Sequence, residues 1–178
     1  MNKAQNRDIM SYEVFPEYDI IWCDPPWEDK MVKYFQTLNH KQTGKVVENN
    51  INGILEKLFS LASNQKPIVV EYSIKGSELV IEYAKKHGHT LTQTVTAIQD
   101  NDLKSYLLVF NTDVRLEQGL RGYINTTEGV KKLNAKLVFD PFAGMGRTAK
   151  AVLLAGAYYH GSELNEARYK KLCKILSV

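Results

Sequence analysis

The tetrapeptide Asp24-Pro25-Pro26-Trp27 brings together the residue types that bind a flat ring carrying an amino group. Pro25 and Pro26 lack a backbone N–H and hold φ at about −65°, so they fix the chain in one rigid turn. A carboxylate and a carbonyl oxygen can then accept the two N–H bonds of the amino group, and the indole can stack on the ring. The same residues could instead form only a strand end and a turn, with Trp27 in the core.

A second motif is the glycine-rich stretch Leu-Val-Phe-Asp-Pro-Phe-Ala-Gly-Met-Gly-Arg-Thr, at residues 137–148. It predicts a short apolar strand, a turn, and a helix from 147 to 155. Gly144 and Gly146 allow positive φ and let the backbone approach a ligand closely at the N-terminus of that helix.

An acidic residue follows the glycine motif at the spacing at which α/β folds place the acid that binds the ribose of a nucleoside. Glu163 comes 17 residues after Gly146, at the end of a strand predicted at 158–162. From this position an acid can bond ribose hydroxyls. A complete Gly-x-Gly-x-x-Gly and a Gly-Lys-Ser/Thr are both missing, which disfavours pyrophosphate and triphosphate cofactors. A nucleoside without phosphates fits the pattern better.

Together the two motifs resemble those of the amino-group nucleic-acid methyltransferases that use S-adenosylmethionine. That family pairs (Asp/Asn/Ser)-Pro-Pro-(Trp/Tyr/Phe) with a loop of the Asp-Pro-Phe-x-Gly-x-Gly type, and residues 19–27 and 137–176 are similar to it. Here the catalytic motif precedes the cofactor loop, as in the permuted, beta-type order. Asp-Pro-Pro-Trp is similar to the version in N6-adenine enzymes, whereas cytosine-N4 enzymes more often begin with Ser.

The resemblance implies a role for each motif residue. Asp24, Pro25, Pro26 and Trp27 would form the catalytic motif and hold a flipped adenine, so that transfer is a direct in-line displacement. Glu163 would bind the ribose of the cofactor, S-adenosyl-L-methionine. Residues expected at the cofactor are Cys23, Asp24, Asp140, Pro141, Phe142, Ala143, Gly144, Met145, Gly146, Thr148, Glu163 and Leu164.

The order of apolar segments predicts an α/β protein with a Rossmann-like methyltransferase fold in circularly permuted order. We expect a mostly parallel sheet with an antiparallel hairpin at one edge. Predicted strands lie at 18–23, 67–71, 90–98, 106–110, 137–140 and 158–162, and predicted helices at 46–62, 77–87, 125–133, 147–155 and 166–176. An Asn125–Glu128 capping box would begin the third helix. Residues 28–50 are polar without clear periodicity. Residues 12–15 could replace the strand that follows the last helix in similar enzymes.

Composition fits one domain over residues 1–178, without a separate target-recognition domain. The chain has 178 residues, 44% of them hydrophobic, a net charge of +3 and a pI of about 8.7. This charge is weaker than an autonomous DNA-binding protein would carry. Neither a signal peptide nor a membrane span is recognisable, and Cys23 and Cys173 read as reduced thiols, so we expect a cytoplasmic protein of bacterial or phage origin. His87 and His89 read as surface residues without partner ligands, so no metal site is expected.

The lysines after the catalytic motif could contact a polynucleotide. Lys30, Lys33, Lys41 and Lys45 alternate with aromatics such as Tyr34, a pattern that combines phosphate contacts with stacking. A solvated loop is the alternative. DNA is the expected partner, with RNA left open, and a homodimer or partner subunit would lengthen the contact surface.

Other activities remain compatible with the motifs. An adenine in RNA or the N4 of cytosine in DNA could be the target. A related motif methylates protein glutamine, but it prefers Asn at the first position and Tyr at the fourth. The chain could also be a non-catalytic, methyltransferase-like nucleic-acid-binding subunit.

Overall fold

The structure is a computed structural model that describes residues 1–178 except 45–47, 99–101 and 120. Its strands are β1 (Lys3–Gln5), β2 (Ile20–Cys23), β3 (Ile68–Ser73), β4 (Leu91–Ile98), β5 (Lys104–Phe110), β6 (Leu137–Asp140) and β7 (Tyr158–Ser162). Its α-helices are α1 (Asp29–Thr43), α2 (Ile51–Leu61), α3 (Ser77–Lys86), α4 (Tyr123–Lys132), α5 (Arg147–Leu154) and α6 (Glu166–Leu176), and a 3₁₀ helix covers Ile9–Ser11.

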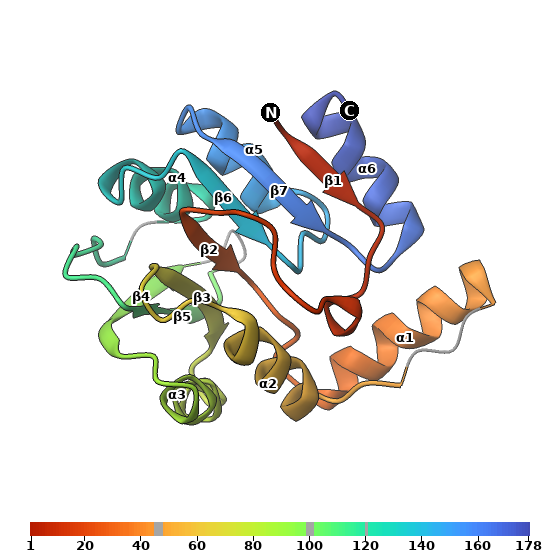
Figure 1. Ribbon diagram of the computed structural model, residues 1–178, viewed down its shortest axis with the longest axis horizontal. Coiled ribbons are helices and arrows are strands. Elements are labelled where there is room, and N and C mark those ends of the chain that lie inside the picture. Colours follow the sequence, from red (N-terminus) through yellow and green to blue (C-terminus); the bar gives the residue numbers. More distant parts are fainter. Residues whose placement is uncertain (45–47, 99–101, 120) are drawn as a thin grey trace.

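The described strands form one mostly parallel sheet in the order β1-β7-β6-β2-β3-β5-β4. Only β5 runs against its neighbours, pairing antiparallel with both β3 and β4. The predicted α/β class, the mostly parallel sheet and the antiparallel edge hairpin are therefore confirmed. β2, which leads into Asp-Pro-Pro-Trp, lies between β6 and β3 in the middle of the sheet (Figure 1).

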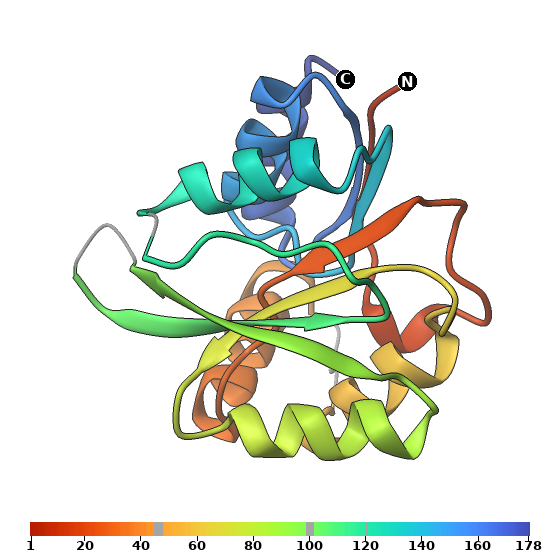
Figure 2. The same ribbon diagram turned by 90° about the vertical axis from the view of Figure 1, so that its left-hand side faces the viewer.

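Helices cover both faces of this sheet, because successive strand residues point to opposite sides. Ile21 and Cys23 of β2 pack with α2 and α3, whereas Ile20 and Trp22 pack with α4, α5 and α6. Figure 2 shows the two helical layers above and below the sheet. Fully buried apolar side chains on both faces hold the central strands rigidly, so their carboxyl ends form a fixed platform.

Three sequence-based expectations of the fold were wrong. Residues 28–50 contain the helix α1, and α2 begins at Ile51 instead of 46. The strand next to β7 is β1, not residues 12–15; Tyr12 and Phe15 are buried in the core instead. The N-cap of α4 is Gly122 without a side-chain bond, and Asn125 lies buried inside the helix, so the capping box does not form.

His89 is also not a surface residue. It is 4% exposed, and its ring bonds the Phe59 carbonyl oxygen at 3.0 Å and the Asn111 side chain at 2.9 Å. Burial lowers the pKa of His89. Its role is therefore to tie the start of β4 to α2. No helix among the described residues is long and apolar enough to cross a membrane.

Candidate active site

Both sequence motifs open into one cavity of about 590 Å³ at the carboxyl ends of the central strands. Asp24 directly follows β2, the glycine loop follows β6, and Glu163 follows β7; these strands are neighbours in the sheet. The volume lies within the range of small-molecule sites, and open α/β sheets bind ligands at this edge.

Most of the residues predicted for the two motifs line this cavity. They are Asp24, Pro25, Pro26, Trp27, Pro141, Phe142, Ala143, Gly144, Met145, Thr148, Glu163 and Leu164. The structure therefore brings together segments more than a hundred residues apart in the sequence. Their individual roles at a cofactor or substrate stay predictions.

The Asp24 carboxylate is oriented by its own motif. Trp27 Nε1 donates to Asp24 Oδ1 at 2.8 Å, which leaves the second carboxylate oxygen able to accept a bond from a ligand. Tyr72 supports this arrangement from β3, because its hydroxyl donates to the Trp27 carbonyl oxygen at 3.0 Å. Tyr72 itself is fully buried and acts as a core residue.

The Asp24 side chain is exposed to solvent in the cavity, although many protein atoms surround its carboxyl group. Loss of hydration and the negative charge of Glu71 raise the pKa of Asp24 to about 8, against the lowering effect of the Trp27 hydrogen bond. Such a raised carboxyl pKa in a cleft is a common property of functional sites.

Backbone groups of the glycine loop are fixed by acids at its two ends. Asp140 Oδ1 accepts from the Phe142 N–H at 2.9 Å, and Glu163 Oε2 accepts from the Gly144 N–H at 2.8 Å. Glu163 Oε1 accepts from the Asn165 N–H at 2.7 Å. Burial raises the pKa of Glu163, while these donors and Arg168 act in the opposite direction. Each Glu163 oxygen keeps a second lone pair for a ligand.

Three residues expected at the cofactor do not line the cavity. Cys23 is fully buried in the core beneath Asp24. Asp140 is 1% exposed, and its carboxylate bonds Phe142 N–H and the Tyr159 hydroxyl. Gly146 packs on α6, where an added Cβ would lie 2.5 Å from Ile175 Cδ1. All three support the loop and the strand ends from inside the protein.

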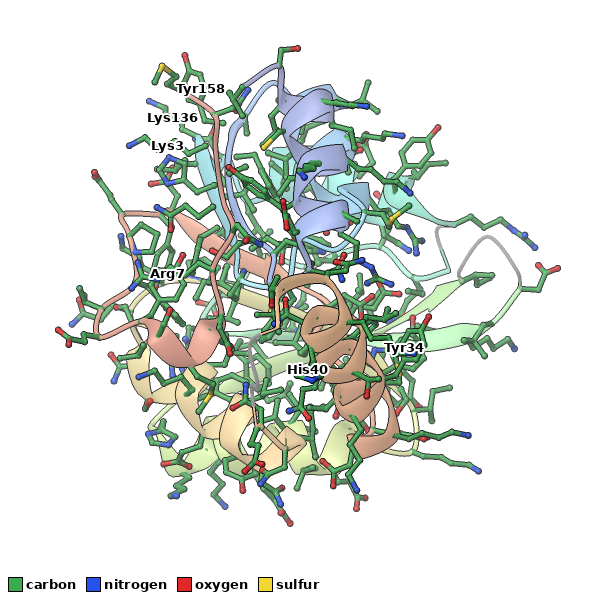
Figure 3. The ribbon with its side chains drawn as sticks, turned by 90° about the vertical axis from the view of Figure 1, so that its right-hand side faces the viewer. Lys3, Arg7, Tyr34, His40, Lys136 and Tyr158 are labelled. Atoms are coloured by element: carbon green, nitrogen blue, oxygen red, sulfur yellow. The ribbon has the colours of Figure 1, made fainter. Side chains whose placement is uncertain are left out.

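The lysine-rich segment lies on the outside of the cavity wall. Val32, Phe35 and Gln36 of α1 face the cavity, whereas Lys30, Lys33, Tyr34 and Lys41 are exposed. At 3.6 residues per turn these exposed residues fall within an arc of about 100°, so they share one helix face. Figure 3 looks at α1 with Tyr34 and His40 labelled. Lys45 lies outside the described residues.

The sequence analysis missed a third part of the cavity wall, formed by the segment after β1. Arg7, Asp8 and Ile9 line the cavity beside Glu163. The segment is tied there by backbone bonds from Arg7 N–H to Glu163 O (3.2 Å) and from Glu163 N–H to Gln5 O (3.0 Å). Three residues of strand without an apolar pattern give no periodic signal, so only the sheet order reveals this contact.

Further cavity residues come from elements without a recognisable motif. Glu71 of β3, Thr126 of α4 and Arg168 of α6 all reach the cavity, and Arg168 stacks on the Phe35 ring at 4.4 Å. This stack and a 2.8 Å bond between Asn165 and Gln42 join α6 to α1. The wall carrying the lysines is thus fixed to the cofactor-loop side of the molecule.

Solved structures match the chain over nearly its whole length, although no family model matches it and no curated protein is similar in sequence. M1.HpyAVI matches with a TM-score of 0.72 and 14% identity, covering 100% of both chains, and it was also crystallised with SAM. TTHA0409 of Thermus thermophilus, a proposed DNA modification methylase also solved with S-adenosyl-L-methionine, matches at 0.66 and 14%, covering 98% of this chain and 94% of its own.

The PvuII DNA methyltransferase, which is cytosine-N4-specific, matches at 0.57 and 13% identity, covering 98% of this chain and 90% of its own. The chain shares the fold of these DNA methyltransferases. At these identities the likeness establishes the architecture alone, because one fold can carry different chemistries.

Proposed function

We propose that this chain transfers a methyl group from S-adenosyl-L-methionine to the N6 amino group of adenine in DNA. The observation that carries the proposal is the single cavity shared by an oriented Asp24 carboxylate and the glycine loop with Glu163. One part of the cavity can hold a nucleoside cofactor while the other holds an amino group, so donor and acceptor meet without a covalent intermediate on the protein.

The cavity residues fit this cofactor. Asp24, Glu71 and Glu163 bring carboxyl groups to the cavity, which suits a cationic sulfonium, and Arg7, Arg147 and Arg168 also line it. At Gly144 (φ +54°) an added Cβ would meet only the Phe142 carbonyl oxygen, at 3.8 Å, so the loop leaves room for a ligand against its backbone. When bound, S-adenosyl-L-methionine would supply an electrophilic methyl group.

The protein's own contribution is positioning and charge. Asp24 and the Pro25 carbonyl would accept the two amino hydrogens, and Trp27 would stack on the ring. This arrangement directs the nitrogen lone pair toward the methyl donor. Glu163 would bond the ribose hydroxyls, and Arg7, Asp8 and Ile9 would form the wall next to it. The exposed lysines of α1 would contact phosphates flanking the target base.

The Asp-Pro-Pro-Trp motif favours adenine N6 over cytosine N4 as the target. Cytosine N4 is the alternative target, because one of the similar solved structures is a cytosine-N4-specific enzyme. RNA adenine and a non-catalytic subunit are further alternatives. We also propose that residues 1–178 act as one domain without a separate recognition domain, and that a second chain, identical or not, extends the contact with nucleic acid.

Labelled methyl transfer to DNA and RNA of defined sequence, followed by nucleoside analysis, tests the proposal. We expect label in N6-methyladenine from DNA. Label only in N4-methylcytosine, or only in RNA, would reassign the target. Absence of transfer together with little or no cofactor binding in calorimetry would favour the non-catalytic subunit.

A further inference from the structure

A second carboxylate, Glu71, stands beside Asp24 at the inner end of the cavity. Cys23 of β2 pairs with Val70 of β3 in the parallel register, so Asp24 and Glu71 are the next positions on neighbouring strands. Paired positions on adjacent strands, about 4.8 Å apart, direct their side chains to the same face. Both residues line the cavity.

Glu71 is held in place from the next strand. The Ser105 hydroxyl of β5 donates to Glu71 Oε1 at 2.8 Å, and Ser105 is fully buried. Glu71 therefore belongs to the rigid sheet and not to a mobile loop. Two carboxylates this close cannot both ionise without cost, so the site favours a state in which the pair holds one proton.

Other charged and titratable groups around Asp24 modify this preference. They are Cys23 of β2, Tyr72 of β3, Asp140 of β6 and Arg147 of α5, and Tyr72 in turn faces the charges of Glu28 and Asp29. Loss of hydration is the largest influence that raises the pKa of Asp24, to about 8, and Glu71 is the second. Arg147 acts in the opposite direction.

We propose that Asp24 and Glu71 form a carboxyl pair that holds one proton without ligand, releases it when the sulfonium cofactor binds, and takes one from the amino group during methylation. This inference rests on the proposed function and adds Glu71 as the partner that makes Asp24 a proton acceptor. A cation in the cavity stabilises the doubly ionised pair, because opposite charge favours the charged form of each carboxyl.

The proton and electron balance of the step closes within the cavity. The nitrogen lone pair forms the new N–C bond while the carbon–sulfur bond breaks and leaves its electron pair on sulfur. Nitrogen then carries the positive charge and gives one proton to Asp24, keeping the electrons of that N–H bond. The pair returns to its singly protonated state, and the products are a methylamino group and a neutral thioether.

Calorimetry in buffers of different ionisation enthalpy counts the protons released on binding. At pH 7.5 we expect S-adenosyl-L-methionine to release about half a proton or more, and neutral S-adenosylhomocysteine to release much less. Glu71→Gln keeps an oxygen acceptor for Ser105 but lacks the charge, so the extra proton release with S-adenosyl-L-methionine should be clearly smaller than in the wild type. Glu71→Asp keeps the charge and should restore the difference.

Equal proton release by the two ligands in the wild-type protein would reject the proposed proton exchange by the Asp24–Glu71 pair. Cofactor binding, and with it the proposed function, would remain supported. Failure of both ligands to bind would reject both. Thermal unfolding of each variant shows that it is folded. A Glu71→Gln protein that distinguishes the two ligands as strongly as the wild type does would show that Glu71 has no part in the proton exchange.

Discussion

At the scale of single residues, the acids of the cavity serve both the fold and the proposed chemistry. Glu163 accepts hydrogen bonds from the backbone N–H groups of Gly144 and Asn165, so it shapes the glycine loop before any ligand arrives. Asp140 does the same for Phe142 from a fully buried position. Because Glu163 is already fixed in place by these bonds, the proposed binding of a ribose would carry a low ordering cost.

Glu163→Gln should weaken cofactor binding about tenfold, because glutamine loses the charge-assisted part of the ribose bonds and its NH2 group cannot accept one of the two backbone N–H bonds. Titration calorimetry with S-adenosyl-L-methionine measures the change. The comparison ligand is an analogue without the ribose hydroxyls, for which the loss of affinity in the variant should be clearly smaller. An equal loss for both ligands would mean that Glu163 acts only by shaping the loop.

At the scale of elements, the two glycines of the loop have different surroundings. Gly144 lines the cavity, whereas Gly146 packs against α6. Gly144 (φ +54°) and Gly146 (φ +82°) both have positive φ, which disfavours alanine by about 1–2 kcal/mol. Gly144→Ala should add a methyl group to the cavity, so cofactor affinity should fall more than about tenfold while the protein stays folded.

Gly146→Ala provides the matched comparison for the loop. Its Cβ would lie 2.5 Å from Ile175 Cδ1 and 3.3 Å from Leu172 Cδ1. Overpacking against α6 should lower stability by about 1–3 kcal/mol more than Gly144→Ala does. Urea unfolding and calorimetry of both variants measure the two effects. A Gly146→Ala protein as stable as Gly144→Ala would contradict the assigned packing role.

The two faces of α1 give a prediction for nucleic-acid binding. Replacing Lys30, Lys33 and Lys41 together by Ala should flatten the log–log salt dependence of DNA binding by about 2–3 and raise the KM for DNA, while cofactor affinity holds. The control replaces three other exposed lysines: Lys85 in the last turn of α3, Lys136 just before β6, and Lys174 in the last turn of α6. Identical salt slopes for the two triple variants would show that the α1 lysines are ordinary solvated charges.

The sequence predicted the strands and helices with strong apolar periodicity, and it missed elements whose signal comes from tertiary contacts. The sequence analysis gives β7 and α6 their observed bounds, and the structure shows that Asn165 caps α6. α1 was missed because its inward face includes Gln36 and Asn39, which dilute the periodic pattern.

The cavity residues also divide into those that a local motif predicts and those that only the fold brings to the cavity. Asp24 and Gly144 lie in local motifs that the chain itself displays. Glu71 and Arg7 reach the cavity only because β3 and β1 are placed beside β2 and β7, and this placement depends on long-range pairing. The burial of Asp140 and Cys23 likewise depends on side-chain directions that a motif does not specify.

At the scale of the whole molecule, a net charge of +3 leaves little excess basic charge for contact with more than a few phosphates. We predict weak nucleic-acid binding by a single chain, with a log–log salt slope of about −2 to −4 and little sequence discrimination. Fluorescence anisotropy at several salt concentrations, combined with sedimentation analysis, measures both. Tight, sequence-specific binding by a demonstrated monomer would contradict the expected need for a second chain.

The central claim is that the cavity divides into a cofactor side and an amino-group side, with Asp24 on the latter. Asp24→Ala, measured for both cofactor affinity and methyl transfer, tests that division most directly. Loss of the carboxylate should cost roughly 2–4 kcal/mol in the transition state, so transfer should fall far below a tenth of the wild-type rate. Cofactor affinity should stay within a few-fold. A variant that keeps more than about a tenth of the rate, or that loses cofactor binding together with activity, would contradict the account.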